Sequence, residues 1–330
     1  MTAETNFDYV KKFVIMKKSK KILKMRIIYQ KRINDKEIKE ISEFKPGCWI
    51  RVKSPTSEDV DFLKKNFKLD PNILRDALDF YEMPRVEKDG DIVYIFIRVP
   101  QKQENEISTA PLLIAVGPDF TVTFGNAENP IINKFAGNQI DFTTTQKTQL
   151  VLLFLSEIMK AYNTFLTGIN KNVREVSSKF SKINEKIIIN FVNSEEIIND
   201  FLLGLTYTKP ALQLILGGKF LRLFKQDQEL MEDLVLKTNE LTELCRSTLK
   251  NIVNIREAYS TIITNDLNKV IKLFTSLTVI LTIPTIIASL YGMNVSLPFS
   301  DLHYAFWMVI GGTIILIAIV FYIFNKNRWL

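Results

Sequence analysis

The chain has 330 residues, and its 43 lysine and arginine residues against 36 aspartate and glutamate residues give a formal net charge of +7. Only two cysteines, Cys48 and Cys245, and one histidine, His303, are present, which excludes a disulfide framework and most metal or nucleophile sites built from these residues. No nucleic-acid-binding motif accompanies the basic charge, so nucleic acid is not expected as a partner.

The first 142 residues predict a mixed α/β domain. Thr56 is expected to cap a helix that runs to about Asn66, because acidic residues follow in its first turn. Pro71 suits the first turn of a second helix, expected over Asn72–Phe80. Apolar alternation predicts strands at Met25–Tyr29, Cys48–Val52, Pro84–Glu87, Asp91–Val99, Pro111–Val116 and Phe120–Phe124. The lysine-rich stretch Lys11–Arg26 lacks the composition of an organelle presequence, and a basic arm or the first strand is expected there.

Residues 143–218 show the apolar spacing of long helices. We expect helices over Leu150–Phe180 and Ser194–Leu216, which form a helical hairpin packed on the next helix. The two glutamates after Ser194 indicate a helix start, and the paired glycines after Leu216 indicate a stop. The apolar segment Ala211–Leu216 is too short to cross a bilayer and is expected in the core.

A single long helix is predicted from Lys219 to Leu290. This stretch contains no glycine and one proline, Pro284, so an unbroken rod of about 108 Å is expected. A helix of this length is not expected to stand alone in water. Its cytoplasmic part, residues 219–272, is therefore expected to pack against other helices, including those of other copies of the chain.

Two charge-free runs near the C-terminus predict a helical hairpin in a membrane. The first run, residues 273–294, carries no charged side chain from Leu273 to Tyr291, which corresponds to a helix of about 28 Å. The second run covers residues 302–325, and the short connection 295–301 joins the two. The chain is therefore predicted to cross the membrane twice, in contact with lipid.

Basic residues flank the two runs on one side of the membrane, at Lys269, Lys272, Lys326 and Arg328. Because positively charged flanks stay in the cytoplasm, both termini are expected inside and the connection outside. The tail 326–330 is then cytoplasmic, and the protein is expected in the cell membrane.

Hydroxyl residues recur along the first membrane run at steps of three and four, which places them on one helix face: Thr275, Thr278, Thr282, Thr285 and Ser289. A polar stripe in a membrane helix is expected to face away from lipid. Asn268 continues the stripe inward. The stripe favours a pore, although close helix packing without a pore remains an alternative, and single hydroxyls often bond only their own backbone. Pro284 is expected to free one backbone carbonyl.

The sequence Tyr291-Gly292-Met293-Asn294 at the outer end of the first membrane run resembles the signature of the CorA family of divalent-cation channels. The resemblance extends through segments upstream, in the expected order: Trp49-Ile50, Ser54-Pro55-Thr56, Leu78-Asp79, Pro84-Arg85-Val86-Glu87 and Pro284–Leu290. It implies an α/β cytoplasmic domain, a long stalk helix and two transmembrane helices in a funnel-shaped homopentamer. The first membrane helices of five copies are expected to line one pore.

The resemblance further implies Mg²⁺ influx, with Co²⁺ and Ni²⁺ as other candidate ions. Gly292, Met293 and Asn294 would form the selectivity filter, where five Asn294 side chains bind a hydrated cation, since Mg²⁺ loses its waters reluctantly. Gly292 is expected to supply backbone freedom for the turn, and Met293 to pack rather than to bind the ion. A helix cap is the alternative role for Asn294. No organic cofactor is expected.

The family is also gated by Mg²⁺ held between cytoplasmic domains of adjacent subunits. The matching positions are Asp76 and Asp233, with Glu257 as a further acid at the inner mouth; ordinary surface acids are the alternative. Two departures from the family pattern stand out. Arg75 occupies a position that is often acidic, and Asp301 is the only acid in the outer connection.

Two other functions remain open from the sequence. One is a Zn²⁺ transporter of the related ZntB type, although the methionine of the signature favours Mg²⁺. The other is a membrane-anchored scaffold without transport. An enzyme is not expected, because no phosphate-binding loop or catalytic triad is visible and the single histidine lies outside the membrane.

Overall fold

The computed structural model describes residues 26–103, 106–125, 129–177, 185–294, 303–327 and 329. The proposed basic arm before Arg26 and the connection 295–301 therefore lie outside the described residues. The chain divides into two compact units. The first contains the described residues up to 177 and those from 185 to 251, and the second contains the described residues from 252 onwards. Each unit is described by itself.

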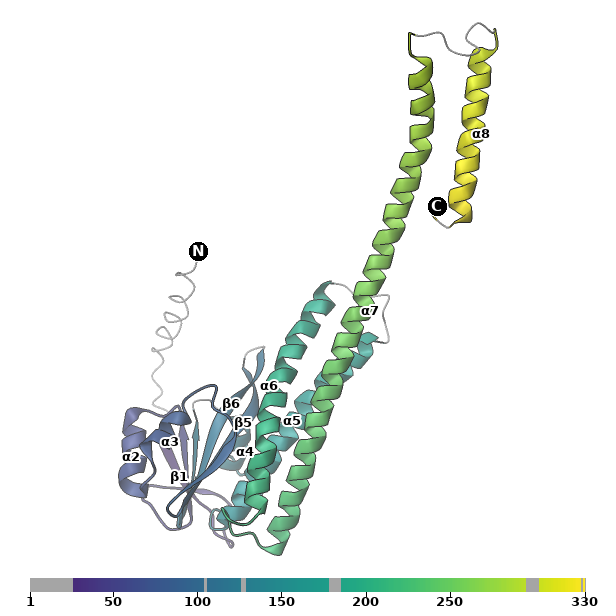
Figure 1. The fold of residues 1–330 in the computed structure, drawn as a ribbon. Coiled ribbons are helices and arrows are strands. Elements are labelled where there is room, and N and C mark those ends of the chain that lie inside the picture. Colours follow the sequence, from purple (N-terminus) through teal and green to yellow (C-terminus); the bar gives the residue numbers. More distant parts are fainter. Residues whose placement is uncertain are drawn as a thin grey trace. The chain divides into compact units, whose positions relative to one another are not determined.

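The first unit contains a seven-stranded mixed sheet in the order β2-β1-β3-β7-β6-β5-β4. Figure 1 labels β1, β5 and β6 of this sheet. Only β3 and β7 pair in parallel; every other neighbouring pair of the described strands is antiparallel. The strands are β1 (Arg26–Gln30), β2 (Lys39–Ile41), β3 (Cys48–Lys53), β4 (Arg85–Asp89), β5 (Ile92–Gln103), β6 (Glu106–Val116) and β7 (Phe120–Gly125). The mixed α/β sheet predicted from the sequence is confirmed, with β2 added and β5 and β6 longer than expected.

Helices cover both faces of the sheet. Successive residues of one strand therefore pack against different helices, because their side chains point to opposite faces. Ile50 of β3 packs in the core formed with α2 (Ser57–Phe67) and α3 (Pro71–Asp76). Trp49, the preceding residue, lies on the other face, where its ring is 5.4 Å from that of Phe154 in α5. The Trp49 indole donates to the Thr123 hydroxyl at 3.0 Å, so its polar group is satisfied although the residue is fully buried.

Local capping sets the ends of the two short helices. Thr56 caps α2 as predicted, and its backbone amide donates to the Asp59 carboxylate at 3.0 Å to complete a capping box. The predicted helix over 72–80 is wrong beyond Asp76. There the amides of Leu78 and Asp79 donate three residues back, at 2.9 and 3.0 Å, in tight turns.

The helices on the second face are α4 (Pro130–Ala136), α5 (Lys147–Ser177) and α6 (Glu185–Leu216). The sequence did not predict α4, which Asn129 caps. The start predicted for α6 at Ser194 is wrong, because the Ser194 hydroxyl donates to the Asn190 carbonyl inside the helix at 2.8 Å. The stop is confirmed: Gly218 adopts a φ of 72°, which favours glycine.

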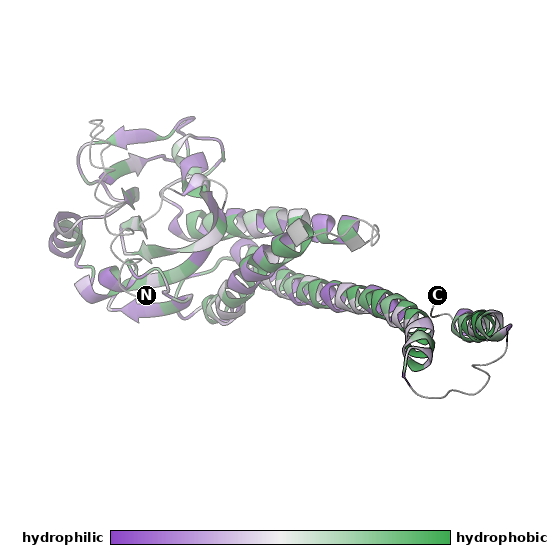
Figure 2. Cartoon of the chain, turned by 90° about the horizontal axis from the view of Figure 1, so that it is seen from above, coloured by the Kyte–Doolittle hydropathy of each residue, from purple (hydrophilic) through white to green (hydrophobic). Residues whose placement is uncertain are grey.

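Two further helices are α7 (Lys225–Tyr291), with 67 residues, and α8 (Ala305–Lys326). The start of α7 lies after the predicted Lys219, where the Phe224 amide donates to the Asp227 carboxylate at 3.1 Å. Pro284 lies within α7. Figure 2 shows mostly hydrophobic residues along α8 and the last turns of α7.

By length and composition alone, three of the described helices are apolar enough to cross a membrane, where the sequence predicted two. The third is Lys147–Val176 in α5. Half (50%) of its most apolar 18-residue stretch is buried in the protein, against 6% of that in α7 and 0% of that in α8. The buried α5 residues, which include Phe154 and Tyr162, pack within the first unit.

Candidate ion pathway and cation sites

The hydroxyl face of α7 points away from α8. In the second unit, α8 and α7 together line a hollow of about 690 Å³, to which α7 contributes Pro284, Ile287 and Tyr291. The hydroxyl positions lie on the opposite side of the helix, since each residue advances the side chain by about 100°. All five of them are exposed: Thr275, Thr278, Thr282, Thr285 and Ser289. The stripe is therefore an uncovered polar face in a helix segment whose apolar side chains are mostly exposed as well, while a sixth hydroxyl, Ser276, lies off the stripe and is fully buried.

Three of the five hydroxyl groups of this face donate their hydrogens within the helix. Thr278 donates to the Phe274 carbonyl at 2.8 Å, Thr282 to the Thr278 carbonyl at 2.7 Å, and Thr285 to the Leu281 carbonyl at 3.1 Å. A hydroxyl has one hydrogen and two lone pairs, so these oxygens present only acceptor sites outward. The waters around a cation direct their hydrogens outward, and a row of acceptors suits them.

The residues 292–294 close the end of α7. The Gly292 amide donates to the Ala288 carbonyl at 2.9 Å, and the Met293 amide donates to the Leu290 carbonyl at 3.3 Å. Gly292 does not have a positive φ, so the turn does not require a left-handed conformation there. A Cβ at this position would instead lie 3.3 Å from the Ala288 carbonyl oxygen, and glycine allows the close turn. Asn294 is exposed.

Two other predicted residues lie on the same helix within the second unit. Asn268 and Glu257 are both exposed. Asn268 lies seven residues before Thr275, two helical turns, and thus continues the hydroxyl face.

Asp76 is the last residue of α3, and its side chain is 49% exposed. Its Oδ2 accepts a hydrogen bond from Arg85 Nη2 at 2.9 Å. The same guanidinium also donates to Glu82 and Glu87 and lies 3.9 Å from the centre of the Phe96 ring. Arg85 belongs to one of the segments that resemble the family, but its spacing from the three acids does not predict this cluster, because the acids are brought together by the turn after α3 and by β4.

Asp233 is exposed on the part of α7 that belongs to the first unit. It lines a groove of about 610 Å³ between α5 and α7, together with Asn163, Thr164 and Lys160. Asp76 and Asp233 offer the oxygen ligands that Mg²⁺ prefers. Among the described residues of one chain, no group of three or more histidine, cysteine or acidic side chains is arranged to hold a metal ion.

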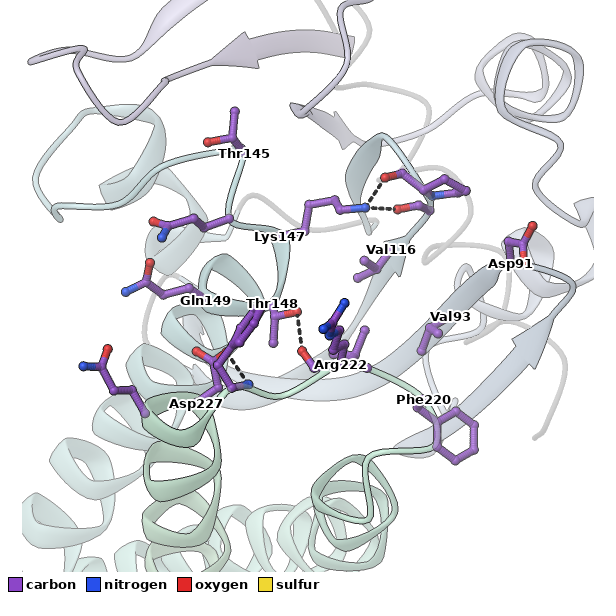
Figure 3. A pocket seen from close by; sticks show the side chains of 16 residues that line it. Asp91, Val93, Val116, Thr145, Lys147, Thr148, Gln149, Phe220, Arg222 and Asp227 are labelled. Carbon is purple, nitrogen blue, oxygen red and sulfur yellow. Dashed lines mark hydrogen bonds between the residues drawn. The ribbon is translucent and has the colours of Figure 1, made fainter.

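In a separate pocket of about 610 Å³ in the first unit, some of the polar side chains hold loops by hydrogen bonds to backbone carbonyls (Figure 3). The Lys147 ammonium donates to the Gly117 carbonyl at 2.6 Å and to that of Pro118. Burial lowers the pKa of Lys147, and nearby Asp119 opposes this shift. The Thr148 hydroxyl donates to the Arg222 carbonyl at 3.2 Å. We assign these contacts to structure.

Comparison with known proteins gives consistent matches over most of the chain. The family described as "CorA-like Mg2+ transporter protein" matches residues 45–326. The cobalt/magnesium transport protein CorA of Methanocaldococcus jannaschii is 26% identical over 294 residues, which cover 86% of this chain and 91% of that protein. The magnesium transport protein CorA of Campylobacter jejuni is 39% identical over 110 residues, 32% of this chain and 34% of that protein.

A solved structure, the complete CorA magnesium transporter from Methanocaldococcus jannaschii, matches with a TM-score of 0.82 at 22% identity. The match covers 94% of this chain and 100% of that chain. At this identity the match shows a shared fold.

Proposed function

This chain belongs to the CorA-like Mg²⁺ transporter family, and from this membership we propose that it admits Mg²⁺ to the cell through a pore formed by five copies. It is a divalent-cation transporter of the membrane and not an enzyme. The observation that carries the proposed pore is the uncovered hydroxyl face of α7, which lies opposite the face turned towards α8.

The proposed pore places the hydroxyl faces of five α7 helices around one axis. Each hydroxyl position then becomes a ring of oxygen acceptors, and α8 lies between α7 and lipid. Mg²⁺ usually keeps several of its waters in proteins. A lumen of acceptors holds these waters by hydrogen bonds without stripping the ion, and weak binding at several successive rings lets the ion leave.

The proposed filter is the turn Gly292-Met293-Asn294, with five Asn294 amide oxygens at the outer mouth. Asn268 is proposed to line the pore further inward, and Glu257 to attract cations near its inner mouth. An inside-negative membrane potential favours entry of a divalent cation by about 4.6 kcal/mol per 100 mV, so no separate energy source is proposed.

The proposed topology has two spans, at 273–294 and 302–325, with both termini in the cytoplasm. We assign α5 to the cytoplasmic core in spite of its apolar composition, since half of its most apolar stretch is already buried within the protein. The cytoplasmic part then comprises the α/β domain 1–142, the helical hairpin 143–218 and the stalk segment 219–272.

The proposed regulation uses Asp76 of one subunit and Asp233 of the next. Both are exposed acids in the first unit. Without a cation two such carboxylates repel each other; when they share Mg²⁺ the repulsion is removed and the closed ring is favoured. Arg75, next to Asp76, removes one ligand that the family often has.

Uptake of Mg²⁺ into proteoliposomes at an imposed inside-negative potential tests the pore. Asn294→Ala is expected to lose most selective Mg²⁺ uptake, while Asn327→Ala, a change at the C-terminal cap of α8, is expected to keep it. Undiminished selective uptake by Asn294→Ala would overturn the filter. Uptake of Zn²⁺ that Mg²⁺ does not inhibit would favour a zinc transporter, and folded protein without any uptake would favour a scaffold.

A further inference from the structure

We propose that Arg85 is an internal counterion that competes with the regulatory cation for Asp76, and so sets the cation concentration at which the protein closes. This inference deepens the regulatory part of the proposed function and rests on it. The observation behind it is the ion pair between Asp76 and Arg85 of the same chain, with 2.9 Å between Oδ2 and Nη2. A carboxylate oxygen bound to a guanidinium is not fully available to a metal ion.

Arg85 is held strongly enough to remain in place when Asp76 leaves it. Its guanidinium also donates to Glu82 and Glu87 and lies 3.9 Å from the centre of the Phe96 ring. Contacts of this kind with carboxylates and an aromatic face suit the planar arginine head group. Release of Asp76 therefore costs Arg85 one of three ionic partners, and the cluster keeps its frame.

Asp76 is the member of the cluster best placed to exchange partners. Its side chain is 49% exposed, against 40% for Glu87 and 17% for Glu82. Its backbone is fixed, because Leu74 of the same helix is fully buried and the Asp76 carbonyl accepts from the Asp79 amide at 3.0 Å. Only the side chain of Asp76 has to turn from Arg85 towards a second subunit.

The charge of the cluster favours exchange with a divalent cation. Three carboxylates share one guanidinium, which leaves a formal charge of −2 within the cluster. This excess attracts a divalent cation about twice as strongly as a monovalent one, because the Coulomb energy is proportional to the charge of the ion. At low internal Mg²⁺ Asp76 is thus paired with Arg85, and at high internal Mg²⁺ it turns towards Asp233 of the neighbouring subunit.

The test measures the internal Mg²⁺ concentration that gives half-maximal protection of the full-length protein from trypsin, alongside the concentration that half-suppresses uptake. Arg85→Gln removes the competitor and is expected to lower both concentrations about fivefold, the scale of a partly exposed ion pair. Glu87→Gln is expected to raise both, because Arg85 then depends more on Asp76 and the cluster loses negative charge. Lys88→Gln, on the same strand, is the control for Arg85→Gln, because it also removes one positive charge but leaves the ion pair between Arg85 and Asp76 in place. It is expected to change the two concentrations little.

Opposite shifts in Arg85→Gln and Glu87→Gln separate competition from a merely structural role, since loss of the cluster's structure would move both variants in the same direction. Shifts in the same direction, or no shift in either, overturn the inference. If Arg85→Gln does not fold, a raised concentration in Glu87→Gln supports competition and an unchanged or lowered one rejects it. If the wild-type protein shows neither protection nor suppression by Mg²⁺, the proposed regulation itself fails, and this result is distinct from the failure of Arg85 alone.

Discussion

The backbone of α7 decides what its hydroxyl groups offer to an ion. Thr282 donates its hydrogen to the Thr278 carbonyl at 2.7 Å, so its oxygen can only accept from outside the helix. The common view of such a bond is that it satisfies the hydroxyl and does nothing more. On an uncovered face the same bond has a second effect, since it fixes the polarity of the surface that a hydrated ion would meet in the proposed pore.

Replacement of Thr282 by valine tests this effect, because valine keeps the shape of threonine and removes the oxygen. Thr282→Val removes a ring of five oxygens in the proposed pore and is expected to lower Mg²⁺ uptake at least about two- to tenfold, the scale of a single net hydrogen bond, while Thr282→Ser is expected to stay near wild type. Thr313→Val is the matched control, since Thr313 of α8 bonds the Val309 carbonyl in the same way at 2.7 Å but lies on the other helix. Equal losses in Thr282→Val and Thr313→Val would assign the effect to helix stability.

At the scale of the element, α7 carries two different faces through its apolar part. One face is turned towards α8, and the other presents the hydroxyl groups. The two native thiols do not interfere with a labelling test of this division. Cys48 and Cys245 are fully buried, and burial raises the pKa of Cys48 to about 11 and that of Cys245 to about 12, so neither forms a reactive thiolate near neutral pH.

Single introduced cysteines should therefore report the faces of α7 directly. A water-soluble methanethiosulfonate reagent is expected to modify Thr282→Cys and Ser289→Cys and to block Mg²⁺ uptake. Ile287→Cys, on the face turned towards α8, is expected to remain unmodified and active. Labelling of Ile287→Cys in preference to the two hydroxyl positions would reverse the proposed orientation of α7 in the pore.

Elements with local signals were predictable from the sequence. The capping box at Thr56, the stop at Gly217 and Gly218, and the one-sided hydroxyl stripe all depend on residues a few positions apart. The same local reading placed a helix start at Ser194, but this serine and the two glutamates after it lie inside α6. Local signals do not show whether the chain upstream is already helical.

Features that depend on long-range contacts could not be predicted. The second helix was predicted to reach Phe80, but the carbonyls of Phe80 and Glu82 accept from Arg98 of β5, at 2.8 and 3.2 Å, outside any helix. Arg98 in turn lies 3.5 Å from Asp200 of α6, far away in the chain. The competition proposed for Arg85 has the same origin, because no spacing in the sequence indicates that Asp76, Glu82 and Glu87 meet one guanidinium.

At the scale of the whole molecule, one chain contains only parts of each proposed site. It has one hydroxyl row, one filter turn and two acids on separate elements, and among its described residues no acidic cluster is arranged to hold a metal. Repetition around a ring would complete all of these at once: rows become rings, and each interface gains one Asp76 and one Asp233. Regulation by identical interfaces is expected to be cooperative, because closure of one interface biases the others.

Removal of divalent cations from the assembled protein tests this last step. Native mass spectrometry is expected to give the mass of five chains, and chelation by EDTA is expected to speed cleavage of the cytoplasmic part by trypsin, because unshielded acids repel across each interface. Asp233→Ala should be cleaved at one rate with and without Mg²⁺, while Glu229→Ala, an exposed acid about one turn earlier on α7, should keep the Mg²⁺ dependence. If Asp233→Ala responds to Mg²⁺ as the wild type does, the cation acts elsewhere. A mass of fewer or more than five chains would instead change the number of oxygens in every proposed ring.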